Sequence, residues 1–236
     1  MNRLVLVFFL ALLLFAESDL PDYGDPEAPA SLYISSTYIE DSLEDTQTPN
    51  IVTAVLADYR GYDTLGETVV IFTAGLAVAL ILSLSNGGDS RPLFRPYGNP
   101  VVDSIARLIA PPILVFALYV IAHGHYGPGG GFQGGAILTG FTILLRLSLG
   151  EAYEHLRFSP QVMTALGSIG LLVFLSVGLL SLPTESEFLD YGGLPFPGIS
   201  SSGLHYLAIL VVEFGIGLAV WGTLVALFDR LMGRQA

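Results

Sequence analysis

The sequence contains no cysteine and no lysine, and only 13% of its 236 residues are charged. Without cysteine the chain cannot form a disulfide, ligate haem through a thiolate or hold an iron–sulfur cluster. Hydrophobic residues make up 52% of it, which is too apolar for a soluble domain and indicates an integral membrane protein. The formal net charge of −12 argues against a nucleic-acid partner.

Five apolar segments approach or reach the roughly 20 residues that cross a bilayer. A sixth, residues 4–16, is shorter and could be the apolar core of a secretory signal peptide. Leu14 is a poor −3 residue for cleavage after Ala16, so we expect an uncleaved span that is short or tilted. We therefore predict an all-α polytopic protein with about six transmembrane helices, the other five at residues 66–85, 101–122, 132–149, 161–182 and 204–228.

All nine positive side chains are arginines, and their distribution predicts the topology. With six spans and both termini in the cytoplasm, every arginine except Arg60 falls on the inner side, as the positive-inside rule requires. Residues 17–47 and 183–203 then lie outside, without arginine and with many acids. We expect a multi-pass protein of the cytoplasmic membrane whose outer face favours cations.

A polar linker at residues 86–100 divides the chain into a two-span part, residues 1–85, and a four-span part, residues 101–236. Within the outer loop, residues 48–67 predict a short amphipathic helix on the membrane face. Thr48 and Pro49 suit its start, Gly61 suits its end, and Thr64 with Glu67 forms a capping box for the next span. Its apolar stripe consists of Ile51, Val52, Val55, Leu56 and Tyr59.

The stretch HGHYGPGGGFQGG, residues 123–135, joins two apolar runs. It matches the dinucleotide fingerprint G-x-G-x-x-G, but that motif needs a strand before it in a soluble βαβ unit, so we reject this function. Gly130 with Gly134, and Gly131 with Gly135, have the small-xxx-small spacing that lets two helix backbones approach closely. Two interpretations stay open: a structural turn covered by neighbouring helices, or a direct role in ion passage.

This stretch resembles the signature of the MnhB domain, the B subunit of Mrp-type multisubunit Na⁺/H⁺ antiporters. Residues 212–223, VEFGIGLAVWGT, resemble the last span of that domain, with Glu213 as its acid. Residues 48–75 resemble the C-terminal end of the Mrp A subunit and the E subunit of membrane-bound hydrogenases. The chain thus resembles a fusion of two parts, and the residues that match the signature are Gly124, His125, Pro128, Gly129, Gly130, Gly131, Phe132, Gly134 and Gly135.

The resemblance implies an accessory, non-catalytic subunit of a Mrp-type cation/proton antiporter. Its partners would be the other subunits of that complex, Na⁺ and/or H⁺, and the lipid bilayer, with no cofactor in this chain. The absence of lysine argues against a pumping core, because the resemblance implies buried lysine–glutamate relays there. The alternative is the same module in the membrane arm of a group 4 hydrogenase or a related redox enzyme. A serine hydrolase built on Ser200, Ser202 and His205 is rejected, because no G-x-S-x-G motif is present.

Ionisable residues near or inside the membrane are the candidates for an ion pathway, because such groups are costly there. Glu213 lies ten residues into the last span and could be a station for a cation or proton, or a carboxyl satisfied by structural hydrogen bonds. Two histidines two residues apart, without a third ligand, do not predict a metal site. The remaining candidates are Glu67, His123, His125, Asp58 and Asp63. The two aspartates and Arg60 could pair among themselves, although the spacing of Asp58 and Arg60 does not favour one helix face.

Overall fold

The computed structural model describes residues 3–85, 99–149, 158–184 and 186–232. Across these ranges the chain is helical and contains no strand, which confirms the all-α fold class. The chain divides into two compact units, Met1–Ser42 and Leu43–Ala236. Most of the predicted linker, and the inner-side residues Arg91, Arg95, Arg157 and Arg234, lie outside the described residues.

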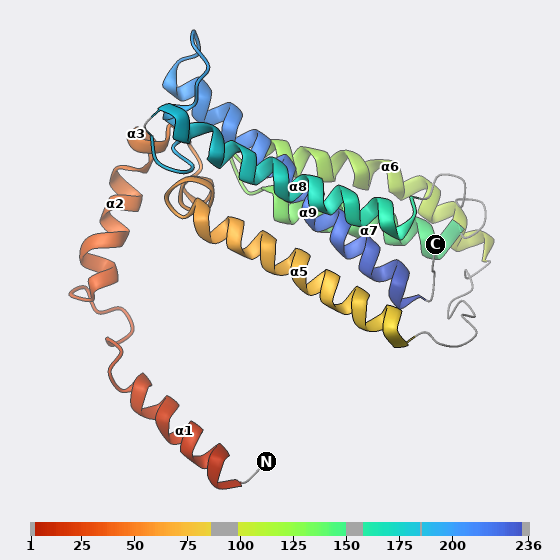
Figure 1. The fold of residues 1–236 in the computed structure, drawn as a ribbon, viewed down its shortest axis with the longest axis horizontal. Helices are drawn as coiled ribbons and strands as arrows, with labels where there is room; N and C mark the ends of the chain where they lie inside the picture. Colours follow the sequence, from red (N-terminus) through yellow and green to blue (C-terminus); the bar gives the residue numbers. More distant parts are fainter. Residues whose placement is uncertain (1–2, 86–98, 150–157, 185, 233–236) are drawn as a thin grey trace. The chain divides into compact units, whose positions relative to one another are not determined.

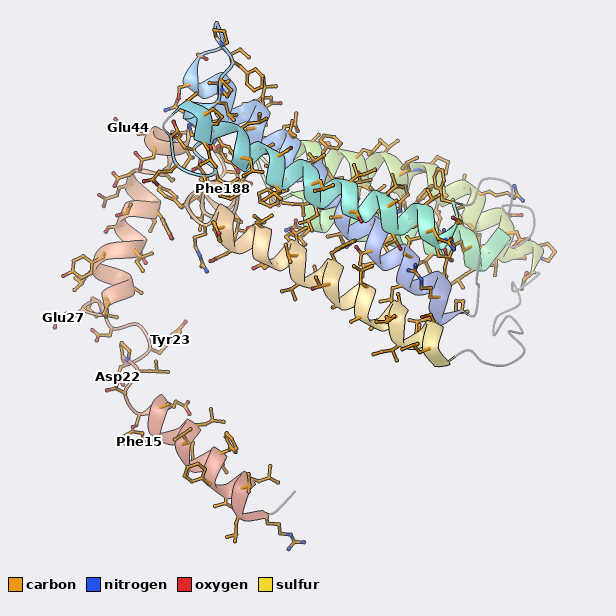
Figure 2. All side chains as sticks on the ribbon, in the orientation of Figure 1. Phe15, Asp22, Tyr23, Glu27, Glu44 and Phe188 are labelled. Atoms are coloured by element: carbon orange, nitrogen blue, oxygen red, sulfur yellow. The ribbon has the colours of Figure 1, made fainter. Side chains whose placement is uncertain are left out.

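The first unit contains α1 (Arg3–Glu17), the π-helical turn η1 (Ala30–Ile34) and α2 (Ser35–Glu40). Its side chains are mostly exposed, including Phe15 and Tyr23, which Figure 2 labels. The 15 residues of α1 are fewer than the roughly 20 that cross a bilayer, so the sixth span stays a prediction. A short helix, α3 (Ser42–Thr46), follows at the boundary between the units.

The second unit is a bundle of long helices, α5 (Gly61–Ser85), α6 (Pro100–His123), α7 (Gly131–Leu149), α8 (Pro160–Ser181) and α9 (Ser201–Leu231), shown in Figure 1. Four helices among the described residues are long and apolar enough to cross a membrane: α5, α6, α8 with the turn after it, and α9. The α7 helix covers the predicted span 132–149 and packs against both α6 and α9.

The core of the bundle is α9, which packs against α5, α6, α7 and α8. Small residues allow this close approach: a methyl group on Gly215 would lie 2.9 Å from the carbonyl oxygen of Gly170, and one on Gly222 would lie 2.6 Å from the amide nitrogen of Gly167. These contacts make α8 and α9 antiparallel neighbours. Interhelical packing in a membrane depends on such small residues, since apolar burial gives little drive for association there.

The segment that the sequence predicts to lie on the outer side, called the outer segment below, consists of α4 (Ile51–Thr53) and the π-helical turn η2 (Ala54–Tyr59). The predicted start at Thr48 is wrong, because the Asn50 side chain accepts the capping hydrogen bond from the Val52 amide, at 3.1 Å. The face buried in the bundle is made of Thr53, Ala54 and Ala57. The predicted apolar stripe is left partly or fully exposed, with Val52 at 56%. Small residues are buried here because they let the segment lie close to the helices beneath.

The predicted capping box at Thr64 and Glu67 is also wrong. The α5 helix already begins at Gly61, so both residues lie inside it. The Thr64 hydroxyl donates instead to the carbonyl oxygen of Leu56, at 2.6 Å, and ties α5 to η2. The Glu67 side chain is exposed.

Candidate functional site

The glycine-rich turn, residues 124–130, connects α6 to α7 and is closed by its own backbone. The Gly130 amide donates to the Val120 carbonyl at 3.0 Å, and the Gly134 amide donates back to the Gly130 carbonyl at 3.0 Å. Gly130 has a φ of +132°, a backbone conformation that side chains with a Cβ rarely adopt. The turn therefore requires glycine at this position for conformational reasons.

The turn is hydrogen-bonded to the start of the outer segment, through the side chains of Asn50 and Thr53. The Asn50 amide group donates to the carbonyl oxygens of Gly124 and Gly127, both at 2.7 Å, and the Thr53 hydroxyl donates to that of Gly124 at 2.6 Å. The backbone amide of Asn50 also donates to the carbonyl oxygen of His125, at 3.0 Å. Irregular backbone at a membrane boundary needs such partners, so the turn and the outer segment form one structure.

The Glu213 carboxylate lies against the first turn of α7. Its Oε2 accepts a hydrogen bond from the backbone amide of Gly131, and the residue is 8% exposed. The first amides of a helix have no partner within the helix, and the helix dipole favours negative charge at this end. The carboxylate is therefore held by a helix N-terminus rather than by a positive side chain.

Three oxygen atoms closely surround the position beside Gly130, where this residue has no side chain. A methyl group placed on Gly130 would lie 3.0 Å from Gln133 Oε1 and 3.2 and 3.4 Å from the two carboxylate oxygens of Glu213. Three oxygens thus converge on one point next to the turn. Oxygen ligands of this kind suit a hard cation, and the carboxylate alone can take a proton.

The glycines that open α7 point to two different neighbours. Gly131 and Gly135 face α9, where a methyl group on Gly135 would lie 2.7 Å from the Gly217 carbonyl oxygen. Gly134 faces α6, where a methyl group would overlap the side chain of Ile121 and lie 3.0 Å from the Ala117 carbonyl oxygen. These contacts make α7 and α9 parallel neighbours in register, so that the start of α7 lies beside Glu213.

We expect Gly131→Val to prevent assembly of the protein into its complex. A Cβ at this position would overlap the Glu213 carbonyl oxygen and lie 2.7 Å from Ile216 Cβ, so the two helices would have to separate. Gly140→Val on the same helix is the matched control, because a methyl group there meets no described atom within 4 Å. Native gels of membranes from both variants measure assembly. A Gly131→Val complex as abundant as the control would contradict this prediction.

The two histidines of the turn have different surroundings. His125 is 1% exposed, its ring lies 4.5 Å from that of Tyr206, and neither ring nitrogen makes a hydrogen bond of normal geometry with a described residue. Burial lowers the pKa of His125, and a backbone group of Tyr206 acts weakly in the opposite direction. The imidazole is therefore neutral at neutral pH. His123 instead stacks on Tyr119, with ring centroids 4.7 Å apart.

The other predicted candidates separate into a buried group and an exposed group. Asp58 Oδ2 lies 3.0 Å from His205 Nδ1, so Asp58 is paired with a residue of α9. Asp63 forms an exposed ion pair with Arg60. Glu67 is exposed on α5. The Asp58 side chain is therefore partly buried against α9, whereas the side chains of Asp63 and Glu67 are exposed.

Sequence reasoning missed three residues that the fold places at this end. Asn50 follows a proline that was interpreted only as part of a helix start. His205 was considered only together with Ser200, as part of a serine hydrolase. Ser200 instead caps α9, because its hydroxyl accepts from the Gly203 amide at 3.2 Å. Tyr191 is completely buried and donates from its hydroxyl to the Ala57 carbonyl at 2.7 Å. Burial raises the pKa of Tyr191, and the negative charges of Asp58 and Glu213 raise it further.

The C-terminal ends of α7 and α9 contain a buried ion pair that the sequence did not predict. Arg146, expected among the inner-side charges, is 3% exposed and forms a salt bridge with Asp229, which is 0% exposed. Between the two ends, the Trp221 indole donates to the Thr142 hydroxyl at 2.8 Å. Polar contacts therefore connect α7 and α9 at three levels.

In the described part of the chain, no three histidine, aspartate or glutamate side chains are grouped to hold a metal ion.

Comparisons with known proteins agree with this architecture. Residues 101–226 match the family described as a domain related to the MnhB subunit of Na⁺/H⁺ antiporters, and residues 23–88 match the family described as the E subunit of MBH. A probable A/B subunit of a K⁺/H⁺ antiporter of Rhizobium meliloti is 29% identical over 80% of this chain, which spans 21% of that protein. A putative antiporter subunit mnhB2 of Staphylococcus haemolyticus is 29% identical over 58% of this chain and 96% of its own length.

Two solved structures share the fold. A chain of the membrane-bound sulfane sulfur reductase, an archaeal respiratory membrane complex, matches with a TM-score of 0.70 and 26% identity over 98% of this chain and 99% of that chain. A chain of the Mrp complex from a Dietzia species matches with a TM-score of 0.67 and 24% identity over 98% of this chain and 26% of that chain. Because the matched MnhB-related region covers more than half of the sequence, the chain belongs to the family of domains related to the MnhB subunit of Na⁺/H⁺ antiporters.

Proposed function

We propose that this chain is an accessory, non-catalytic membrane subunit of a Mrp-type cation/proton antiporter, and that its α7–α9 interface contributes to the ion pathway. The observation that carries the proposal is Glu213, a carboxylate inside a membrane-spanning helix that is held by the Gly131 amide. An ionisable group at this depth is costly and is usually functional. The family membership and the antiporter relatives support the same function.

The surroundings of Glu213 suit reversible binding better than a permanent structural contact. The Glu213 carboxylate accepts from a neutral backbone amide, so its negative charge is not neutralised by this partner and can attract a cation or proton. Both carboxylate oxygens and Gln133 Oε1 surround one point beside Gly130, so three oxygen ligands gather there. A structural carboxyl would instead be expected to have a guanidinium partner, as Asp229 has in Arg146.

We infer six membrane crossings with both termini in the cytoplasm. Contacts within the second unit support this topology, because the turn before α7, the segment before α9 and the segment before α5 all meet at one end of the bundle. Asn50 contacts Gly124, and Tyr191 contacts Ala57. The acidic segment 183–203 therefore lies at this end, which the arginine distribution assigns to the outer side.

A second candidate function places the same subunit in a redox-driven membrane complex. It is favoured by the end-to-end match to a chain of the membrane-bound sulfane sulfur reductase, which contains both parts of this chain in one polypeptide. The match to the E subunit of MBH is in line with it. In such a complex the subunit would couple electron transfer in other chains to ion movement, without a cofactor of its own.

Affinity purification of the tagged protein from its own membranes, followed by mass spectrometry, separates these functions. We expect the other subunits of an antiporter complex to co-purify, and we expect membrane vesicles to show cation-dependent proton movement that is lost when the gene is deleted. Redox subunits in the same preparation would favour the second candidate.

We also expect the chain to aggregate or be degraded when expressed alone, since its exposed apolar helices need partners. A monodisperse isolated chain with no partners in the native membrane would refute both functions.

A further inference from the structure

A histidine at the start of α9 forms a buried pair that links two distant parts of the sequence. His205 Nδ1 lies 3.0 Å from Asp58 Oδ2, and the two side chains are 9% and 20% exposed. The residues are 147 positions apart in sequence. Asp58 lies in η2, a π-helical turn in which the Arg60 amide donates to the Val55 carbonyl at 2.8 Å. Single π-helical turns of this kind often occur at functional sites.

The second ring nitrogen of His205 faces the outer surface. A methyl group placed on Gly192 would lie 3.3 Å from His205 Nε2, 3.3 Å from Ser201 Oγ and 3.4 Å from Asp190 Oδ1. Both Ser201 and Asp190 are exposed. The imidazole thus has a partly buried carboxylate on one side and the polar surface loop on the other.

The surroundings of the His205 ring determine which of its nitrogens carries the proton. In the neutral imidazole, the Asp58 carboxylate keeps the proton on Nδ1, so that Nε2 is the acceptor. A proton taken from water then forms a new N–H bond at Nε2, and the imidazolium charge is balanced by the carboxylate. Loss of that proton to water breaks the same bond and restores the starting state.

The pair lies on the helix that carries Glu213. Glu213 is eight positions after His205, which is about 12 Å along an α-helix. Binding of a proton changes the net charge of the pair from −1 to 0, so it alters the electrostatic potential at Glu213 in a low-dielectric interior. Two titratable groups lie beside the pair: Asp190 in the surface loop, and Tyr191 in η5 (Tyr191–Gly193), whose ring centroid lies 6.0 Å from that of His205.

We propose that the Asp58–His205 pair is a proton-binding site at the outer end of the ion pathway, and that its occupancy controls ion-coupled transport through Glu213. The proposal rests on the proposed transport function. It assigns a role to His205, which joins Asp58 from the outer segment to the helix that carries Glu213. The proton exchanges with the outer water through Nε2, on the side of Ser201 and Asp190.

The test measures cation-driven proton movement by the whole complex in proteoliposomes, as a function of the pH on the outer side. His205→Gln keeps a hydrogen-bonding side chain but cannot bind a proton at neutral pH. We expect this variant to assemble and to lose the dependence on outer pH that the wild type shows. Asp58→Asn removes the carboxylate that lies beside Nδ1, so we expect its dependence on outer pH to differ from that of the wild type. The wild-type complex, reconstituted in parallel, is the reference for both variants.

The outcomes separate this inference from the function on which it rests. A wild-type complex without ion-coupled proton movement refutes the proposed function. A transporting wild type together with a His205→Gln variant of unchanged pH profile overturns only the role of the pair. If native gels show that His205→Gln does not assemble, Asp58→Asn decides, and an unchanged pH profile of that variant overturns the inference.

Discussion

Replacing Glu213 with glutamine leaves the complex assembled and lowers its ion-coupled activity at least about tenfold, equivalent to ~1.4 kcal/mol or more. Assembly is retained because the amide has nearly the shape of the carboxyl and its oxygen can still accept from the Gly131 amide. Activity falls because the amide has no charge to attract a cation and does not bind a proton at neutral pH. Proton or sodium movement in inverted vesicles measures the effect, with subunit content determined on gels.

Two further variants show whether the charge itself is needed. Glu213→Asp should retain part of the activity, since the charge stays while the reach shortens by one methylene. Glu67→Gln makes the same chemical change on an exposed carboxyl of α5 and should resemble the wild type. Full activity of a normally assembled Glu213→Gln complex would remove Glu213 from the ion pathway and make it a structural hydrogen bonder.

The second large effect is expected at the other end of α9. Asp229→Leu leaves the Arg146 guanidinium buried without its carboxylate, and both residues are nearly inaccessible. Removing one member of a buried ion pair costs about 3–5 kcal/mol, because the remaining charge has no compensation. We therefore expect a strong loss of thermal stability in the purified complex, measured as the temperature at which it aggregates in detergent.

A double replacement distinguishes an unpaired charge from a lost packing contact. Arg146→Met combined with Asp229→Leu removes both charges and keeps apolar volume, so it should recover most of the stability. If the double variant is as unstable as Asp229→Leu, the packing around the two side chains and not the charge is responsible. If Asp229→Leu alone is as stable as the wild type, the salt bridge has no structural role.

Features that repeat locally were predictable from the sequence. Apolar runs identify a membrane protein and place the helices to within a few residues, because hydropathy and helix length are properties of a short stretch of chain. The spacing of Gly131 and Gly135 indicates close helix packing for the same reason, and both face α9 in the fold. Glu213 could be selected because a carboxyl in the middle of an apolar run is conspicuous in any arrangement of the helices.

Local rules misplaced the outer segment. Thr64 and Glu67 have the spacing of a capping box, yet α5 begins at Gly61 and the Thr64 hydroxyl bonds to Leu56. The apolar stripe was expected to be buried, but the small residues Ala54 and Ala57 face the bundle. Local hydrogen bonds and helical periodicity are weak compared with the contacts that the glycine turn offers to Asn50 and Thr53.

The sequence by itself determined that this is a helical membrane protein of the MnhB-related family with a deep carboxyl in its last span. Only the tertiary structure decided what each polar group meets. Asp58 pairs with His205, 147 positions away, and Arg146 is buried against Asp229. The physical reason is that a buried charge takes whichever partner helix packing brings within reach, and that partner is usually far away in the sequence.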